Sequence, residues 1–281
     1  MSRQVSELLR QLKGQPFWKM TGSGNDFVFV DARGASEPLL TSPEVIQAIC
    51  HRGNGIGADG IVLILEDDAA AFAIRYFNAD GSLASLCGNA TLCATRLGTV
   101  IGAADPSGFL IATDAGVVQA RLAGDLPEID LQPVTDVQPA FQSALEPGEN
   151  RIGFATAGVP HLTVLVDDVE SVAVRSRGSD LRHHKALSAG ANANFVSGGP
   201  ASWHIRTFER GVEDETLACG TGAVASAVLL RTWGLETGDV LLQTRSGRPL
   251  LVRLIPDGAQ WLVSLRGEGR IVFSGQFSEL A

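Results

Sequence analysis

Hydrophobic and polar residues alternate along most of this chain, in short runs separated by Gly, Pro, Asn and Asp. Such alternation between turn residues predicts β-strands. The runs that we expect to form strands are 17–20, 27–31, 61–65, 71–77, 109–113, 117–122, 128–131, 162–166, 203–208, 240–244, 249–255, 260–265 and 270–274. Short strands joined by tight turns favour an antiparallel arrangement, without a regular strand–helix–strand rhythm.

Three longer segments have helical character. Residues 43–50 begin with Pro43 and follow Ser42, and this Ser-Pro pair is typical of a helix start. After residue 87 the apolar positions recur on one face, and residues 223–234 are apolar on almost every face, so both helices should be buried within their sheets. Cys50 and Cys93 fall on apolar faces and are expected in the core.

A loop of one pattern occurs twice, at 78–91 and at 209–222. Each copy has a polar, acidic stretch, then a Cys followed by Gly and a small polar residue, and then an apolar helical run. The two cysteines, Cys87 and Cys219, are 219 − 87 = 132 residues apart, close to half of the 281-residue chain. The spacing predicts a duplicated unit, with a Pro- and Glu-rich connector at 133–150.

A thiol placed just before a helix lies at the positive end of the helix dipole, which favours the thiolate. The free N–H groups of the first turn can bind a carboxylate, and Gly after the Cys lets the backbone approach a ligand closely. A single such Cys is more often a buried small hydrophobe, but the matched pair favours chemistry. The N–H groups concerned belong to Gly88, Asn89, Gly220 and Thr221.

The composition is that of an ordinary globular protein of about two domains. Its net charge is −9 and its isoelectric point is about 5.0. These values oppose binding to nucleic acid or to an anionic membrane and favour a small-molecule partner. Four cysteines without C-x-x-C pairs suggest free thiols, and no long apolar stretch or signal peptide is evident, so we expect a cytoplasmic protein. The neighbouring His183 and His184 lack metal-site spacing and are expected at the surface.

At these loops the chain resembles the diaminopimelate epimerases, which are cofactor-independent amino-acid racemases and epimerases. The resemblance extends over about residues 17 to 280. The segments that carry it, in the order of the family, are Lys19–Phe27, His51–Gly60, Asn78–Cys93, Pro160-His161, Asn192–Phe195 and Glu209–Gly222.

The resemblance implies an α/β fold of two similar domains, each a curved, mainly antiparallel sheet or barrel around a central helix. The domains would be related by a pseudo-twofold axis, with the active site in the cleft between them. We expect the first domain at 17–132, with segment 268–281 returning to it, and the second at 133–267. Residues 1–16 have helical apolar spacing but are expected to be a solvated or loosely docked extension.

Epimerisation removes a weakly acidic α-proton from one face of a carbon and supplies another to the opposite face, so it needs a base and an acid that exchange roles. Cys87 and Cys219 suit this task as a thiolate and a thiol. The resemblance further implies that His161 pairs with Cys87 and Glu209 with Cys219. It implies interconversion of LL- and meso-2,6-diaminopimelate in lysine and peptidoglycan precursor synthesis, without cofactor or metal, by a homodimer.

The far end of such a substrate carries a second ammonium and carboxylate. Arg210 has the charge for that carboxylate, and by family position Asn78 and Asn192 offer polar contacts, while Asn25 would point into the cleft.

The chain departs from the family pattern at several positions. Val159 replaces a common distal-site Asn, Leu92 replaces an Arg, Ala90 replaces a Gly, and a Gln often found near Gly60 is missing. Losing an amide at position 159 costs about 1–3 kcal/mol if its partner is left buried and unsatisfied. These departures bear on substrate specificity and leave the two cysteines unchanged.

Two alternatives stay open. A racemase of another amino acid would keep the cysteines but lack the distal contacts, and Val159 is compatible with it. A non-catalytic redox protein that forms a Cys87–Cys219 disulfide would not need Asn78, Asn192 or Arg210.

Overall fold

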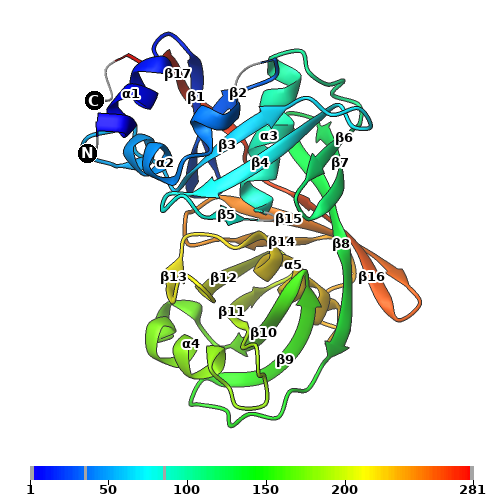
Figure 1. The fold of residues 1–281 in the computed structure, drawn as a ribbon. Coiled ribbons are helices and arrows are strands. Elements are labelled where there is room, and N and C mark those ends of the chain that lie inside the picture. The colour runs from blue at the N-terminus through cyan, green and yellow to red at the C-terminus, as the bar shows by residue number, and fades with distance from the viewer. Residues whose placement is uncertain (1–2, 35–36, 85–86, 279–281) are drawn as a thin grey trace. The chain divides into compact units, whose positions relative to one another are not determined.

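The computed structural model describes residues 3–34, 37–84 and 87–278 (Figure 1). The chain divides into two compact units. Unit 1 comprises Met1–Ile129 with Glu268–Ala281, and unit 2 comprises Asp130–Gly267. The C-terminal segment therefore returns to the unit that contains the N-terminus. The first two residues of the expected extension and the last three of the returning segment lie outside the described residues.

In unit 1 the strands carry the apolar runs of the first half of the sequence. Its elements are α1 (Arg3–Gln11), β1 (Pro16–Gly22), β2 (Asn25–Asp31), the 3₁₀ helix η1 (Glu37–Leu40), α2 (Pro43–Cys50), β3 (Gly60–Leu65), β4 (Phe72–Asn78), β5 (Leu83–Ala84), α3 (Gly88–Val100), β6 (Phe109–Thr113), β7 (Gly116–Ala123), the start of β8 (Leu126–Gln138) and β17 (Arg270–Gln276).

Unit 2 contains the rest of β8 and the elements that follow it. These are β9 (Glu149–Ala157), β10 (Val159–Val166), η2 (Val169–Ser171), α4 (Val174–Arg182), β11 (Asn192–Gly199), β12 (Ser202–Glu209), β13 (Asp214–Thr216), α5 (Gly220–Thr232), β14 (Val240–Gln243), β15 (Pro249–Asp257) and β16 (Gln260–Arg266).

The two units repeat one strand-pairing pattern. In unit 1, β1–β2, β3–β4, β4–β5 and β6–β7 are antiparallel, whereas β2–β3 and β4–β6 are parallel. In unit 2 the antiparallel pairs are β9–β10, β11–β12, β12–β13 and β14–β15, and the parallel pairs are β10–β11 and β12–β14. The helices α2 and α4 lie in the equivalent crossovers between parallel strands. The predicted duplication is therefore present in the topology, and the parallel pairs are a feature that the strand patterning did not predict.

The register fixes which residues correspond between the units. Val28 pairs with Ile61, which pairs with Phe77 in unit 1. Leu162 pairs with Ala193, which pairs with Phe208 in unit 2. On β2 and β10 the preceding residues, Phe27 and His161, correspond. On β4 and β12 the next residues, Asn78 and Glu209, correspond, and each is the last residue of its strand.

A helix lies at the centre of each unit. The helix α3 packs against β1, β2, β4, β7 and β17, and α5 packs against β9, β10, β11, β15 and β16. Almost all residues of α5 and most of α3 are buried, as their apolar sequences require. The predicted fold class, two similar units that each have a mainly antiparallel sheet around a central helix, is confirmed.

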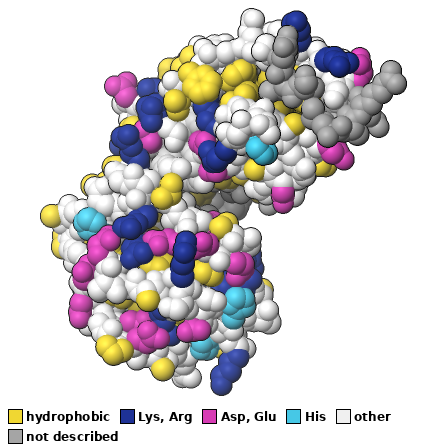
Figure 2. Space-filling model, turned by 90° about the vertical axis from the view of Figure 1, so that its left-hand side faces the viewer, with side chains coloured by type: hydrophobic (Ala, Val, Ile, Leu, Met, Phe, Trp, Pro, Cys, Tyr) yellow, Lys and Arg dark blue, Asp and Glu magenta, His cyan; other side chains and the backbone are white. Residues whose placement is uncertain are grey.

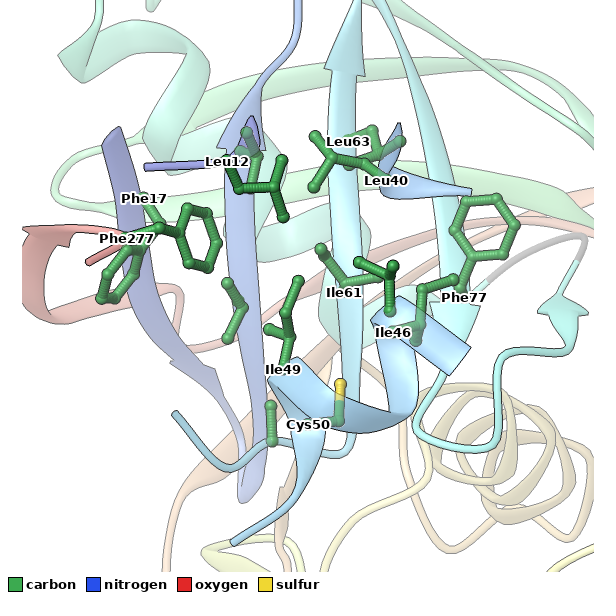
Figure 3. Close-up of a cluster of buried hydrophobic side chains, with 14 of the residues drawn as sticks. Leu12, Phe17, Leu40, Ile46, Ile49, Cys50, Ile61, Leu63, Phe77 and Phe277 are labelled. Atoms are coloured by element: carbon green, nitrogen blue, oxygen red, sulfur yellow. The ribbon is translucent and has the colours of Figure 1, made fainter. Parts of the chain in front are cut away.

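One hydrophobic cluster of unit 1 joins both ends of the chain (Figure 3). Leu9 and Leu12, in and just after α1, are 1% and 4% exposed and pack in a cluster with Phe17 and Phe277. Burying a Leu side chain contributes about 1.5–3 kcal/mol. The expectation that residues 1–16 form a loosely docked extension is therefore wrong: α1 is part of the core.

The connector between the repeated halves is shorter than predicted. The strand β8 continues through Pro133 to Gln138 and pairs with β9, where Gln138 lies opposite Phe154. A Pro is tolerated where its position needs no ladder N–H. The segment without regular structure is thus limited to residues 139–148.

The surface carries mixed charges. On the face in Figure 2, Lys and Arg side chains are interspersed with Asp and Glu, without a basic stripe. Such mixing gives no electrostatic footprint for nucleic acid on that face. Among the described residues, no helix is long and apolar enough to cross a membrane. His183 is exposed, as expected.

Candidate active site

Cys87 and Cys219 occupy the same position in the two units. Each is the N-cap of a 13-residue helix, α3 or α5. The backbone of Cys87 has φ −134° and ψ 114°, and that of Cys219 has φ −129° and ψ 111°. Neither helix has a side-chain cap. The predicted placement of both thiols at the start of a buried helix is therefore what the structure shows.

Both helices begin with a first turn whose N–H groups have no intrahelical acceptor. The first helical hydrogen bonds run from Thr91 N–H to the Cys87 carbonyl and from Ala223 N–H to the Cys219 carbonyl. The N–H groups of Gly88, Asn89, Gly220 and Thr221 precede these bonds in their helices. Each pair is a preorganised donor set for an anion.

Cys219 lies in a closely packed environment. Its Sγ is 3.7 Å from Glu209 Oε1 and 3.6 Å from Thr221 Oγ1. Burial, followed by the charge of Glu209, raises the pKa of the Cys219 thiol well above its usual value, although the Gly222 N–H and Thr221 lower it. At Cys219 desolvation therefore outweighs the helix dipole and favours the thiol, whose Sγ lies within hydrogen-bond distance of Glu209.

Glu209 ends β12 beside this thiol. Burial raises the pKa of its carboxyl, while a hydrogen bond from Cys219 lowers it. The two groups share one desolvated site, so a proton on one affects the other. The predicted pairing of Glu209 with Cys219 is thus consistent with their contact within unit 2.

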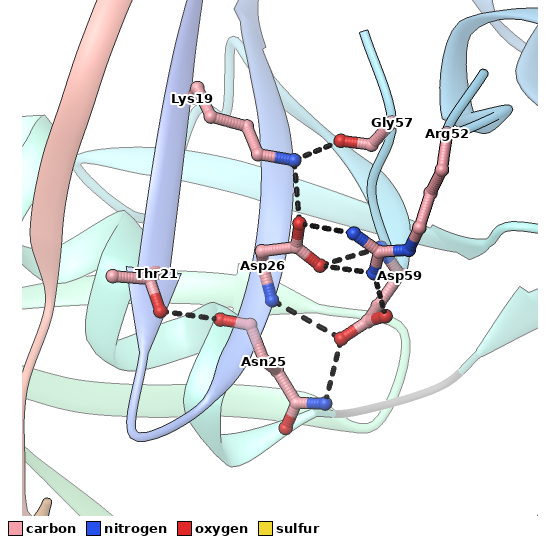
Figure 4. Close-up of polar contacts among 7 residues, drawn as sticks. All are labelled: Lys19, Thr21, Asn25, Asp26, Arg52, Gly57 and Asp59. Atoms are coloured by element: carbon pink, nitrogen blue, oxygen red, sulfur yellow. Dashed lines mark hydrogen bonds and ion pairs between the residues drawn. The ribbon is translucent and has the colours of Figure 1, made fainter. Parts of the chain in front are cut away.

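In unit 1 a chain of polar side chains reaches the first turn of α3, and Figure 4 shows the part formed by Asn25 and Asp59. Asn89 Nδ2 donates to Asn25 Oδ1 at 2.7 Å, and Asn25 Nδ2 donates to Asp59 Oδ2 at 3.0 Å. Asn89 is 3% exposed, and its Oδ1 has no hydrogen-bond partner among the described residues. The amide of Asn89 is therefore oriented by Asn25, with its oxygen left as an acceptor.

An ion-pair cluster holds this chain in place (Figure 4). Arg52 bridges Asp26 and Asp59, at 2.7 Å and 2.6 Å, and Lys19 Nζ donates to Asp26 Oδ2 at 2.7 Å and to the Gly57 carbonyl. Burial alone would raise the pKa of Asp26, but hydrogen bonds from Arg52 and Lys19 outweigh it and lower the pKa to about 2. Asp26 is therefore ionised at neutral pH, and the cluster fixes the start of β2.

Asn78 ends β4 and donates from Nδ2 to Ser82 Oγ at 3.0 Å. It corresponds to Glu209 in the register, so the two repeated loops carry different side chains at one backbone position. The thiol Cys219 has a carboxylate beside it on its own unit, whereas the equivalent strand end in unit 1 supplies an amide. The two units therefore share the backbone position at this strand end but carry an amide there in unit 1 and a carboxyl group in unit 2.

His161 and Asn192 lie on the neighbouring strands β10 and β11, where they pair in register. His161 is fully buried, and burial, followed by the charge of Arg210, lowers its pKa to about 3. Asn192 Oδ1 accepts a hydrogen bond of 2.8 Å from the backbone N–H of Arg210. The guanidinium of Arg210 donates from Nη1 to the Ala189 carbonyl at 3.1 Å. His161 is therefore a neutral imidazole near a fixed arginine.

Each unit thus brings together part of the predicted site. Unit 1 holds Cys87, Gly88 and Asn89 on α3, with Asn25 linked to Asn89. Unit 1 also holds Asn78 at the end of β4, and unit 2 holds the other predicted residues. Among these, contacts join Cys219 to Glu209 and Thr221, and Asn192 to the backbone N–H of Arg210. The pairing of His161 with Cys87 joins different units and stays a prediction.

Two polar residues were missed by reasoning from the sequence, namely Asp59 and Asn194. Both fall inside motifs that carry the family resemblance, but nothing in their spacing indicated hydrogen bonds to Asn25 and His161. The departures Ala90 and Leu92 are fully buried in α3, so they pack in the core of unit 1.

A pocket of about 540 Å³ is lined by residues of the 139–145 segment and by Trp233. None of the candidate residues lines it. A much smaller pocket of about 10 Å³ includes Cys87, Tyr76 and Ala84 in its lining.

Solved structures with this fold include a phenazine biosynthesis protein and a hydroxyproline epimerase. A phenazine biosynthesis protein of the PhzF family from Bacillus anthracis matches with a TM-score of 0.75 and 15% identity, covering 94% of this chain and 99% of that one. A hydroxyproline epimerase from Agrobacterium vitis, with bound trans-4-hydroxy-L-proline, matches with a TM-score of 0.62 and 19% identity over 96% and 94% of the two chains. At these identities the likeness defines the fold: a two-unit architecture shared by epimerases and PhzF proteins.

Sequence comparison defines the family more narrowly. The diaminopimelate epimerase family model matches residues 17–134 and again residues 153–271. The diaminopimelate epimerase of Gemmatimonas aurantiaca is 51% identical over 277 residues, which cover 94% of this chain and 99% of the relative. That of Aquifex aeolicus is 38% identical over 94% and 98% of the two chains. The chain belongs to the diaminopimelate epimerase family, as its motifs predicted.

Proposed function

We propose that this protein is an isomerase that interconverts LL- and meso-2,6-diaminopimelate by a two-base mechanism. The observation that carries the proposal is the matched pair of thiols, each the N-cap of an equivalent helix in one of two repeated units. A single base would suffice for exchange of a proton, whereas inversion by direct protonation needs a second group on the opposite face. Family membership supplies the substrate.

The proposed roles follow from the environments of the thiols. Cys219, held as a thiol beside Glu209, supplies a proton to the α-carbon, while Cys87 as a thiolate removes one from the other face. In the reverse direction the roles exchange. Glu209 then accepts the proton of Cys219, and its own raised pKa makes that transfer less costly.

We assign the carboxylate next to the reacting α-carbon of the substrate to the N–H donors at the helix N-termini. The N–H groups of Gly88, Asn89, Gly220 and Thr221 are donors that stay fixed while negative charge develops on the carboxylate. The buried Oδ1 of Asn89 is an acceptor for the adjacent α-ammonium of the substrate. No lysine Schiff base is required for these steps.

The distal end of the substrate is assigned to Arg210, Asn78 and Asn192, with Asn25 supporting Asn89. Val159 begins β10 as Asn25 begins β2, so an apolar side chain occupies a position that carries an amide in the other unit. This observation favours one alternative, a racemase of an amino acid without a polar distal group. We place it second, because the chain belongs to the diaminopimelate epimerase family and because the Asn192 side chain is held by the backbone N–H of Arg210.

We further propose that the enzyme is a cytoplasmic homodimer that serves lysine and peptidoglycan precursor synthesis. These assignments rest on the family, and the compartment rests also on the four free cysteines.

The test is a diastereomer assay under reducing conditions, with LL-diaminopimelate, meso-diaminopimelate and a panel of simple amino acids. Interconversion of the two diaminopimelates, with little turnover of the panel, supports the proposal. Turnover of a monocarboxylic amino acid alone would favour the alternative racemase, and no turnover of any amino acid would refute both.

A further inference from the structure

Asn194, on β11, has a side-chain amide whose orientation is fixed by two buried hydrogen bonds. Its Nδ2 lies 2.9 Å from the Leu162 carbonyl oxygen, and Thr207 Oγ1 lies 2.9 Å from its Oδ1. A carbonyl oxygen only accepts, so the atom that faces Leu162 must be the nitrogen. Asn194 is fully buried and cannot exchange these partners for solvent.

The same nitrogen faces the imidazole of His161. Asn194 Nδ2 is 3.3 Å from His161 Nδ1. The amide has two hydrogens, one donated to Leu162 and the other directed at Nδ1, so Nδ1 must be the acceptor. In a neutral imidazole the proton is then on Nε2, and burial keeps His161 neutral.

The Nε2–H group itself is an unused donor. It is buried and has no hydrogen-bond partner among the described residues. A buried donor left unpaired is unfavourable, and an acceptor supplied during turnover would satisfy it. The site therefore presents a directed N–H in a dry environment, suited to an anionic acceptor.

We propose that Asn194 is a positioning residue that holds His161 as the Nε2–H tautomer. The inference rests on the proposed function and on the pairing of His161 with Cys87 that the family resemblance implies, in which a thiolate would accept this N–H. A neutral N–H donor stabilises the thiolate without surrendering a full proton, so the sulfur stays basic enough to remove the α-proton.

Asn194 also contacts the helix that follows the second thiol. A Cβ added at Gly222 would lie 2.3 Å from Asn194 Oδ1. The Gly222 N–H in turn hydrogen-bonds the Cys219 sulfur. One buried amide thus sets the proton position on His161 and packs against the turn that holds Cys219.

The variant that tests this role is Asn194→Asp, which keeps the shape of the side chain but replaces the NH₂ donor by an acceptor. His161 should then move its proton to Nδ1 to satisfy the carboxylate, leaving Nε2 without a proton. We expect kcat to fall by about 10-fold or more, with KM little changed. The matched control is Thr163→Val. Thr163 lies on β10, next to Asn194, and its substitution removes a buried hydrogen bond of 3.2 Å to Ser226 of α5 but leaves the Asn194 amide unchanged.

The tautomer is read directly by ¹⁵N NMR of the histidine-labelled full chain, with the signal of His161 assigned by its loss in His161→Gln. The wild type should show Nε2 protonated and Nδ1 bare, and Thr163→Val should show the same. A Nδ1-protonated or doubly protonated His161 in the wild type overturns the proposal, whether or not Asn194→Asp folds. Unchanged kcat in a folded Asn194→Asp also overturns it. If the wild type shows the expected tautomer but no epimerisation, the proposed function fails and the role of Asn194 in setting the tautomer stands.

Discussion

Replacing His161 by Phe should change how the stability of unit 2 depends on pH. The structure supplies the substitution, because Phe27 occupies the corresponding position in unit 1 and is fully buried there. His161 has a pKa lowered from 6.5 to about 3 by burial and by Arg210. Between pH 6.5 and about pH 3, His161 is therefore protonated in the unfolded chain but neutral in the folded chain.

The sign and size of the effect follow from this difference. Since the unfolded state binds more protons in this window, the contribution of His161 is fully present above pH 6.5 and is lost as the pH falls toward about 3. The loss is about 1.4 kcal/mol per pH unit, or about 2 kcal/mol between pH 6.5 and about pH 5. A Phe at this position does not titrate and should not show this loss.

The assay is urea unfolding of wild type and His161→Phe at about pH 8 and about pH 5, followed by fluorescence. Carboxylates contribute equally to both proteins, so the quantity of interest is the difference in unfolding free energy between the variants. We expect that difference to shift by about 2 kcal/mol in favour of His161→Phe at the lower pH. An equal difference at both pH values would refute the conclusion that His161 is buried and neutral.

Three further substitutions test other parts of the account. Leu12→Ala should cost about 2–5 kcal/mol in urea unfolding, because it leaves a cavity in the core that α1 completes; a change below about 1 kcal/mol would mean that α1 is loosely docked. Gly222→Ala should abolish turnover and destabilise unit 2 by about 1–3 kcal/mol, because its Cβ would overlap Asn194, and normal activity would contradict that contact. Asp59→Ala should raise KM more than it lowers kcat, because Asn25 loses its fixed acceptor; steady-state kinetics with unchanged KM would count against the link.

The sequence was sufficient to predict the elements that carry chemistry. The placement of Cys87 and Cys219 before buried helices followed from the repeated Cys-Gly pattern and the apolar runs behind it. The correspondence of the two halves followed from a spacing close to half the chain. Both predictions depend on local pattern and periodicity, which sequence reports well.

Long-range packing was not predictable in the same way. The burial of Leu9 and Leu12 depends on Phe277, which lies at the opposite end of the chain and comes near only after β17 pairs with β1. The passage of β8 through Pro133 depends on which N–H groups its neighbours need. Neither fact has a local signature in the sequence.

The electrostatic state of the site was also beyond the sequence. A helix N-terminus favours a thiolate, but whether Cys219 is ionised depends on how completely Glu209 and the core exclude water. The roles of Asp59 and Asn194 depend on hydrogen bonds between neighbouring strands and on the orientation of single amides. Such details are fixed by tertiary packing, so they emerged only with the structure.

The most direct test of the central claim is the fate of the α-proton in deuterium oxide. Wild-type enzyme, Cys87→Ala and Cys219→Ala are each incubated with LL-diaminopimelate, and deuterium at the α-carbon of substrate and product is followed by NMR at low conversion. The two-thiol account predicts that the first meso product carries solvent deuterium and that either substitution lowers kcat/KM for epimerisation by about 100-fold or more. Early meso product that retains its original hydrogen, or epimerisation that survives either substitution, would contradict it.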